Sequence, residues 1–153
     1  MKYAVSSCLM GINCKYSGGN NANEELMAYM KEQQCLLVCP EVLGGLPIPR
    51  ACSEQCNGRV MNTKNEDVTT AFVLGAQRAL QQLLDHNIDL VITQPRSPSC
   101  GKGMIYSGTF SNQLIKGDGI FVQLCIKNGF QVMNVDEFLK QNKYNTSNGV
   151  KSL

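Results

Sequence analysis

Short apolar segments alternate with segments of helical periodicity along most of this chain. Each apolar segment has the length of a buried strand, and the four are residues 3–7, 35–38, 88–92 and 130–133. Between them, apolar spacing and capping residues predict helices from about Asn21, from Asp67 to about His86, from Asp118, and briefly from Asp136. This order predicts a single-domain, Rossmann-like α/β fold with three layers, in which helices cover both faces of a mostly parallel sheet.

The composition is that of a globular protein in solution. Hydrophobic residues make up 43% and charged residues 17% of 153 residues, enough for one domain with a real core. We expect that domain to span residues 1–140 and the polar residues 141–153 to form a flexible tail. The oligomeric state is left open.

The net charge and the distribution of apolar residues indicate which partners and which cellular compartment to expect. A net charge of +2 gives no indication of a nucleic acid or an anionic membrane as a partner. No apolar segment is long enough to cross a bilayer, and the N-terminus lacks the form of a signal peptide. We therefore expect a cytoplasmic protein whose thiols are reduced.

Three of the eight cysteines stand just after the ends of predicted strands. They are Cys8, Cys39 and Cys100, and each lies in a loop rich in Gly, Pro or Ser. The carboxyl ends of parallel strands share one edge of the sheet, where such folds place their sites. Loops of this kind are poor places for inert core thiols, so we predict that the three thiols converge in one reactive or metal-binding site.

The ligand chemistry leaves two kinds of metal open. Three thiolates suit a zinc ion with an open fourth position, or an iron–sulfur cluster bound at three irons with the fourth iron open. Cys52 and Cys56 form a weak candidate pair, and His86 at a helix end is not expected to be a ligand. Cys35 and Cys125 are expected to pack as small hydrophobic residues.

Other side chains share the predicted edge of the sheet. Glu41 follows Cys39 by two residues and either shuttles protons or merely accepts backbone N–H bonds. Ser97 and Ser99 precede the third cysteine. Cys14 lies in the loop that follows the first one and is a fourth ligand, a resolving thiol or, as we favour, a residue that packs behind the ligands.

Two basic residues are weaker candidates for the site. Arg50 either holds an anionic group or pairs with Glu54, and we favour the ion pair. Lys102 stands between two glycines, but the Gly-x-x-x-x-Gly-Lys pattern of a phosphate loop is absent, so a nucleotide-binding function has little support. The three prolines and two glycines of residues 39–50 predict an irregular loop.

Several sequence blocks, in order over about residues 3–135, resemble the domain of unknown function 523 family, which includes the iron–sulfur thiouracil desulfidases. The blocks are Ser7-Cys8-Leu9-Met10-Gly11, Tyr16 with Gly18-Gly19, Cys39-Pro40-Glu41-Val42 with Gly44-Gly45-Leu46, Pro49-Arg50, Asp67-Val68-Thr69, Ser97-Pro98-Ser99-Cys100-Gly101, Tyr106 with Gly108-Thr109-Phe110, and Gly117-Asp118-Gly119. The Cys-Pro-Glu and Ser-Pro-Ser-Cys-Gly blocks together are specific.

The resemblance implies a compact α/β fold and a [4Fe-4S] cluster held by Cys8, Cys39 and Cys100. It implies that the open iron takes the sulfur of a small thiolated substrate such as 2-thiouracil, while water supplies the oxygen of the product. Glu41 would then be the acid/base and Ser97 would position water or substrate. We assign Cys14, Arg50, Ser99 and Lys102 to substrate contact or to support of the ligands. The alternative is a zinc or iron–sulfur protein without catalysis, such as a sulfur carrier or redox sensor.

Overall fold

A computed structural model, which describes residues 1–147, has the predicted parallel sheet at its centre. Its strands are β1 (Lys2–Ser6), β2 (Gln34–Val38), β5 (Leu90–Thr93) and β8 (Gln131–Asn134). They pair in the order β2-β1-β5-β8, and every pair is parallel. Each strand overlaps one of the apolar segments from which it was predicted, so the fold class is confirmed.

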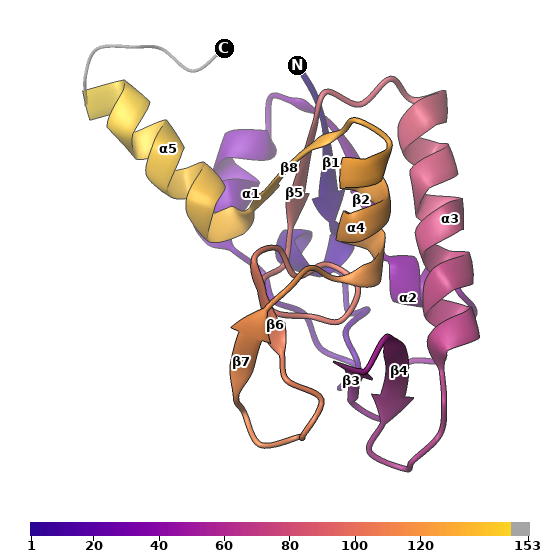
Figure 1. Cartoon of the computed structure of the whole chain (residues 1–153). Coiled ribbons are helices and arrows are strands. Elements are labelled where there is room, and N and C mark those ends of the chain that lie inside the picture. Colours follow the sequence, from indigo (N-terminus) through magenta and orange to yellow (C-terminus); the bar gives the residue numbers. More distant parts are fainter. Residues whose placement is uncertain (148–153) are drawn as a thin grey trace.

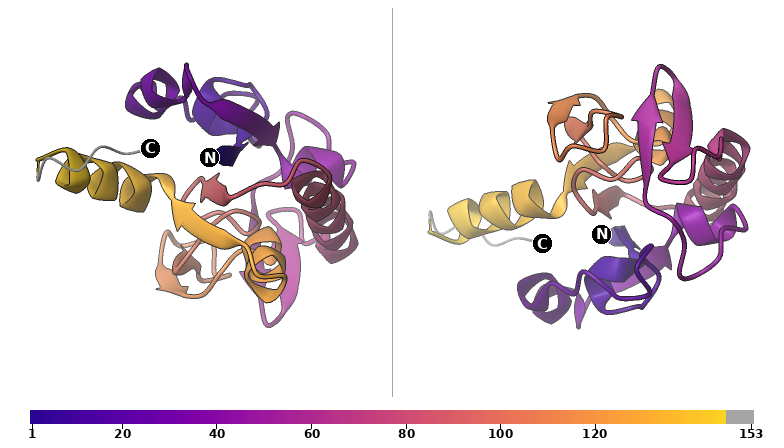
Figure 2. Two further views of the ribbon diagram at one scale, coloured as in Figure 1. Left: turned by 90° about the horizontal axis from the view of Figure 1, so that it is seen from above. Right: turned by 90° about the horizontal axis from the view of Figure 1, so that it is seen from below.

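Helices cover both faces of this sheet (Figures 1 and 2). The helices α1 (Glu24–Met30) and α5 (Val135–Ser147) lie on one face, and α3 (Thr69–Asp85) and α4 (Ile120–Lys127) lie on the other. The alternation of side chains along β1 explains the two cores: Tyr3 and Val5 pack toward α1 and α5, whereas Ala4 packs toward α3 and α4. The result is a three-layer α/β domain.

Smaller elements gather at the carboxyl edge of the sheet, in the lower half of Figure 1. They are the 3-10 helix η1 (Ser7–Met10), the helical turn α2 (Pro40–Leu43), the hairpin of β3 (Ser53–Cys56) and β4 (Arg59–Asn62), and the hairpin of β6 (Met104–Tyr106) and β7 (Leu114–Lys116). The expectation of a wholly irregular loop at residues 39–50 was wrong, because Pro40 occupies the first turn of α2, where its missing N–H has no cost.

Helix starts differ from the predicted caps. The cap of α1 is Asn23, whose Oδ1 accepts from the N–H of Leu26 at 3.0 Å, and not Asn21. Asp67 lies before α3 and accepts from the N–H of Thr69 at 3.0 Å. Asp118 accepts from the N–H of Gly103 at 2.7 Å and so fixes a loop, while α4 begins at Ile120.

The predicted tail is partly helical. Residues 141–147 continue α5, and the remaining residues 148–153 lie outside the described part of the chain, so the flexibility of the tail stays a prediction. The first turns of α5 pack on the core through Phe138 and Leu139, and this packing supports the helical turns that follow.

Two glycines allow α2 to lie directly on α3. A Cβ added at Gly75 would overlap the carbonyl oxygen of Pro40 and lie 2.8 Å from its carbonyl carbon. A Cβ added at Gly44 would overlap the carbonyl oxygen of Ala71. The backbones of the two helices are therefore in contact, and side chains at these two positions would drive them apart.

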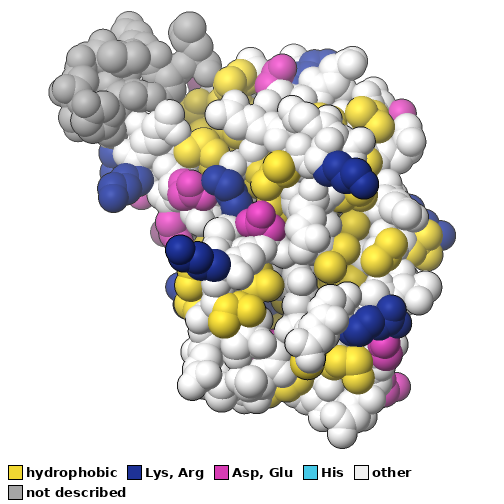
Figure 3. Space-filling model, viewed as in Figure 1, with side chains coloured by type: hydrophobic (Ala, Val, Ile, Leu, Met, Phe, Trp, Pro, Cys, Tyr) yellow, Lys and Arg dark blue, Asp and Glu magenta, His cyan; other side chains and the backbone are white. Residues whose placement is uncertain are grey.

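The surface shown in Figure 3 is mixed in charge. Lys and Arg side chains are dispersed over this face, some beside acidic ones, and hydrophobic side chains gather over the β6–β7 hairpin. That hairpin exposes Met104, Leu114 and Ile115. Among residues 1–147, no helix combines the length and the apolar character needed to span a membrane.

Candidate metal centre and active site

The three predicted cysteines line one cavity of about 240 Å³ at the carboxyl edge of the sheet. Cys8 comes from η1 after β1, Cys39 stands between β2 and α2, and Cys100 lies in the loop after β5. Cys8 and Cys100 are only 9% and 6% exposed, so their thiols face the interior of the cavity and not bulk water. Neighbouring strands thus deliver residues that are far apart in sequence to one place.

The spacing of these thiols bears on the kind of metal centre that they could hold. Thiolates around one zinc ion lie about 3.8 Å apart, as follows from Zn–S bonds of about 2.3 Å. Within residues 1–147, no three His, Cys, Asp or Glu side chains come close enough to share one metal ion. An iron–sulfur cluster binds each thiolate at a different iron and so needs wider spacing. At about 240 Å³ the cavity is also many times the ~10–15 Å³ that one water molecule needs on the same measure.

Burial controls the ionisation of two of these cysteines. Burial raises the pKa of the Cys8 and Cys100 thiols, and the nearby thiol of Cys39 adds to this effect. Two raised thiol pKa values in one cavity disfavour free thiolates at neutral pH. A bound cationic centre removes this penalty, because a coordinated thiol is deprotonated. The site is therefore suited to a positively charged metal group.

Cys39 is the exception among the three. A hydrogen bond from the thiol of Cys14 lowers the pKa of Cys39 to about 7, and the N–H of Val42 and the charge of Arg50 act in the same direction against the opposing effect of burial. The same contact with Cys39 raises the pKa of Cys14, which is only 4% exposed. Cys14 therefore contacts a predicted ligand, and its assignment to the support of that ligand stays a prediction.

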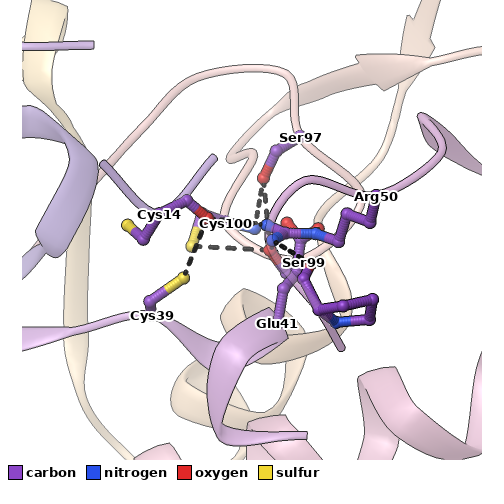
Figure 4. Close-up of polar contacts among 8 residues, drawn as sticks. Cys14, Cys39, Glu41, Arg50, Ser97, Ser99 and Cys100 are labelled. Atoms are coloured by element: carbon purple, nitrogen blue, oxygen red, sulfur yellow. Dashed lines mark hydrogen bonds and ion pairs between the residues drawn. The ribbon is translucent and has the colours of Figure 1, made fainter. Parts of the chain in front are cut away.

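A partly buried carboxylate completes the cavity (Figure 4). Oε1 of Glu41 accepts from Nε of Arg50 at 3.2 Å, and Oε2 accepts from Oγ of Ser99 at 2.9 Å. Arg50 also donates to the carbonyl oxygens of Cys14 at 2.9 Å and Pro47 at 3.2 Å. The side chains of Arg50 and Glu41 are 6% and 17% exposed, so this ion pair holds the carboxylate in one orientation.

The preferred pairing of Arg50 with Glu54 was wrong. Glu54 instead accepts from the N–H groups of Gly108 and Phe110 at 2.9 and 3.2 Å, which ties β3 to the loop after β6. The sequence offered two carboxylates near Arg50, and only the position of α2 decides between them.

The two serines of the third loop have different partners. Oγ of Ser97 accepts from the N–H of Cys100 at 2.7 Å and lies 3.4 Å from Oγ of Ser99. Ser99 has one hydroxyl proton, and Glu41 at 2.9 Å is a better acceptor for it than the sulfur of Cys100 at 3.6 Å. Glu41, Ser99 and Ser97 therefore form a continuous chain of polar groups along the cavity wall.

Sequence reasoning missed two donors to the sulfurs of the predicted ligands. Nδ2 of Asn21 donates to Sγ of Cys8 at 3.5 Å. The hydroxyl of Ser6 donates to the Cys100 thiol and lowers its pKa in part. Ser6 carried no signal beyond its place at the end of β1, and the capping-box spacing of Asn21 pointed to a helix start instead.

The remaining candidates lie apart from this constellation. Lys102 lies outside the cavity wall and pairs with Glu137 of α5 at 3.2 Å. Cys52 lines the cavity, whereas Cys56 in β3 does not, so the two form no joint ligand pair. The other three side chains sit elsewhere: Cys125 is fully buried in the core, Cys35 packs against the opposite core, and His86 is exposed at the end of α3 with Nδ1 2.8 Å from the carbonyl oxygen of Gln82.

Fold and site together define an α/β protein with a cysteine-lined, carboxylate-bearing cavity at the carboxyl edge of a parallel sheet. The sequence profile of the 2-thiouracil desulfurase family matches residues 4–137. The chain belongs to this family, the same domain of unknown function 523 family that its sequence blocks resemble.

Two relatives place the chain within the family. An uncharacterized protein of Bacillus subtilis (strain 168), YbbK, is 36% identical over 143 residues, which cover 87% of this chain and 95% of YbbK. The solved structure of TudS, a [4Fe-4S]-dependent thiouracil desulfidase, superimposes with a TM-score of 0.85 at 36% identity and covers 91% of this chain and 93% of its own. The fold and the family are thus shared over nearly the whole length.

Proposed function

We propose that this protein is a [4Fe-4S]-dependent desulfidase that converts the C=S group of a small thiolated compound such as 2-thiouracil to C=O. The observation that carries the proposal is one cavity that contains Cys8, Cys39 and Cys100 together with the oriented carboxylate of Glu41. The similarity to TudS at 36% identity supports it. In the overall reaction water supplies the oxygen and the sulfur leaves as sulfide, so no external oxidant or reductant is needed.

The three thiolates would hold the cluster, and the chemistry it supplies when bound is a Lewis-acidic iron for a soft thiocarbonyl sulfur. The cavity walls would exclude bulk water and contact the substrate. Burial keeps bulk water away from Cys8 and Cys100, so polar interactions inside the cavity are strong. Pro40 and Pro98 add apolar wall suited to a flat ring.

Glu41 is the group that moves the proton. Arg50 holds Oε1, and the hydroxyl of Ser99 donates to Oε2, so a proton can reach Oε2 through that hydroxyl. Ser97 accepts an N–H bond from Cys100 and keeps its own hydroxyl proton to orient a water molecule or the substrate. Attack of water on the carbon needs a base, and departure of sulfide needs an acid, and one carboxylate can serve both in turn.

The test begins with anaerobic reconstitution of the protein with iron and sulfide. We expect a brown protein that releases sulfide from 2-thiouracil. Replacement of Cys8, Cys39 or Cys100 by Ala should abolish both the colour and the activity, whereas Cys56→Ala, outside the cavity, should keep both. A colourless protein that retains one tightly bound zinc ion would contradict the proposal.

Two matched substitutions isolate the carboxylate. Glu41→Gln and Arg50→Gln both break the ion pair at 3.2 Å, but only the first removes the acid/base. If Glu41 moves the proton, Glu41→Gln should lose about 100-fold or more in sulfide release beyond the loss in Arg50→Gln, at equal iron content. Equal losses would assign the carboxylate a structural role. A cluster without any sulfide release would favour the non-catalytic alternative of a sulfur carrier or redox sensor.

A further inference from the structure

Asn21 makes two hydrogen bonds to Cys8, although it does not cap α1, whose cap is Asn23. Its backbone N–H donates to the carbonyl oxygen of Cys8 at 3.0 Å, and its side-chain Nδ2 donates to Sγ of Cys8 at 3.5 Å. Two residues further on, the N–H of Asn23 donates to the carbonyl oxygen of Leu9 at 2.9 Å. The segment before α1 therefore runs alongside η1 and aims the Asn21 amide at one ligand sulfur.

Lys15 fixes which end of the amide faces the sulfur. Its Nζ donates to Oδ1 of Asn21 at 3.3 Å. An ammonium group has donors only, so the amide oxygen must face Lys15 and the NH₂ group must face Cys8. Both Lys15 and Asn21 line the cavity. The positive charge also polarises the amide and makes its N–H group a stronger donor.

We propose that Asn21 is a positioning residue of the metal centre, which, held by Lys15, donates to the Cys8 thiolate and draws electron density from this ligand. The inference rests on the function proposed above. Hydrogen bonds to ligand sulfurs stabilise the more negative, reduced state of an iron–sulfur cluster and so raise its reduction potential. They also make the thiolate a weaker electron donor, which leaves the open iron a better acceptor for the substrate's sulfur.

The decisive measurement is the reduction potential of the reconstituted cluster in two Asn21 variants. Asn21→Leu keeps the branched shape without the donor or any new charge, and Asn21→Ala removes both shape and donor. We expect the potential to move to more negative values in both variants and by similar amounts. Asn128→Ala, which removes an amide at the far end of α4, should leave the potential unchanged. A shift in Asn21→Ala alone would show that the side chain only fills space and would overturn the proposal.

A double-mutant cycle tests the part of Lys15. Lys15→Met should also lower the potential, because the amide loses the contact that orients it. If Lys15 acts through Asn21, its substitution should have a smaller effect in the Asn21→Leu background than in the unmodified protein. Equal effects in the two backgrounds would mean that Lys15 acts as a separate charge, which would refute the relay.

Retention of the cluster gives an independent readout. Loss of a partner behind a metal ligand commonly costs about 10- to 100-fold in metal affinity. Asn21→Leu should therefore release iron to a chelator about 10-fold faster than Asn128→Ala does. Failure of the two proposals is distinguishable: an unmodified protein that forms no cluster refutes the proposed function, whereas a normal cluster indifferent to Asn21 refutes only this inference.

Discussion

The contact between the backbones of α2 and α3 makes Gly75 a sensitive position. An alanine there would place its Cβ against the carbonyl group of Pro40, and a carbonyl group within a helical turn cannot rotate away as the end of a side chain would. The two helices must separate instead. Because α2 begins directly after Cys39 and contains Glu41, the separation displaces a predicted ligand and the predicted acid/base together.

Two opposing effects set the size of the change. Alanine in a helix interior is favoured over glycine by about 1 kcal/mol. Forcing atoms into a well-packed contact costs about 1–3 kcal/mol, and the rigid obstacle at Pro40 places Gly75→Ala near the upper figure. We therefore expect a net loss of about 2 kcal/mol in the free energy of unfolding, equivalent to a fall of about 4–8 °C in the melting temperature of a chain this long.

Urea unfolding of the apoprotein and the iron content after reconstitution check this estimate. Gln77→Ala on the exposed face of the same helix is the control and should change stability by no more than about 0.5 kcal/mol. Gly75→Ala should be less stable and hold less iron than the control. A Gly75→Ala protein that is about 1 kcal/mol more stable than the unmodified one, with full iron content, would refute the reasoning, because helix propensity alone would then govern the site.

Three further predictions follow from the site. In the apoprotein, Cys39 should be the first cavity thiol that iodoacetamide alkylates, and the alkylation rate should rise as the pH passes through about 7, because the thiolate is the reactive form. In Cys14→Ala the hydrogen-bond donor is lost, so the midpoint of the alkylation rate against pH should move to higher pH. An unchanged midpoint would exclude that donor. Gly119→Ala should lower the iron content after reconstitution, because a Cβ there would overlap the carbonyl oxygen of Ser99, next to the predicted ligand Cys100. An unchanged iron content would show that the loop accommodates the added Cβ and would contradict this prediction. Lys102→Ala should leave sulfide release unchanged and cost at most about 0.5 kcal/mol, because its ion pair is exposed and lies outside the cavity; a marked rise in KM for 2-thiouracil would contradict this assignment.

The sheet could be predicted from sequence because its strands are buried on both faces. Strands such as β5 read as uninterrupted apolar runs, and the helices between them have clear apolar stripes. The convergence of the cysteines that follow β1, β2 and β5 could then be predicted from the geometry of parallel sheets. The hairpins could not be predicted in this way, since β6 and β7 have three residues each and expose most of their side chains.

Pairing within the site depends on tertiary structure. Nothing in the spacing of Arg50 tells whether Glu41 or Glu54 is its partner, because both are within ten residues. The contact of Asn21 with a sulfur thirteen residues earlier could not be predicted from the sequence either, since an asparagine before a helix is usually a cap. Such partners are selected by how loops fold over the edge of the sheet, a long-range property that local patterns do not record.

The separation of the three predicted ligands along the chain has a consequence for biosynthesis. A local pair such as Cys-x-x-Cys can capture metal on an unfolded or partly synthesised chain, but Cys8, Cys39 and Cys100 meet only when β1, β2 and β5 are paired. A nascent chain shorter than about two thirds of its final length lacks one of them. Delivery of the proposed cluster would therefore require a folded domain, and its donor would have to recognise a finished surface and not an emerging peptide.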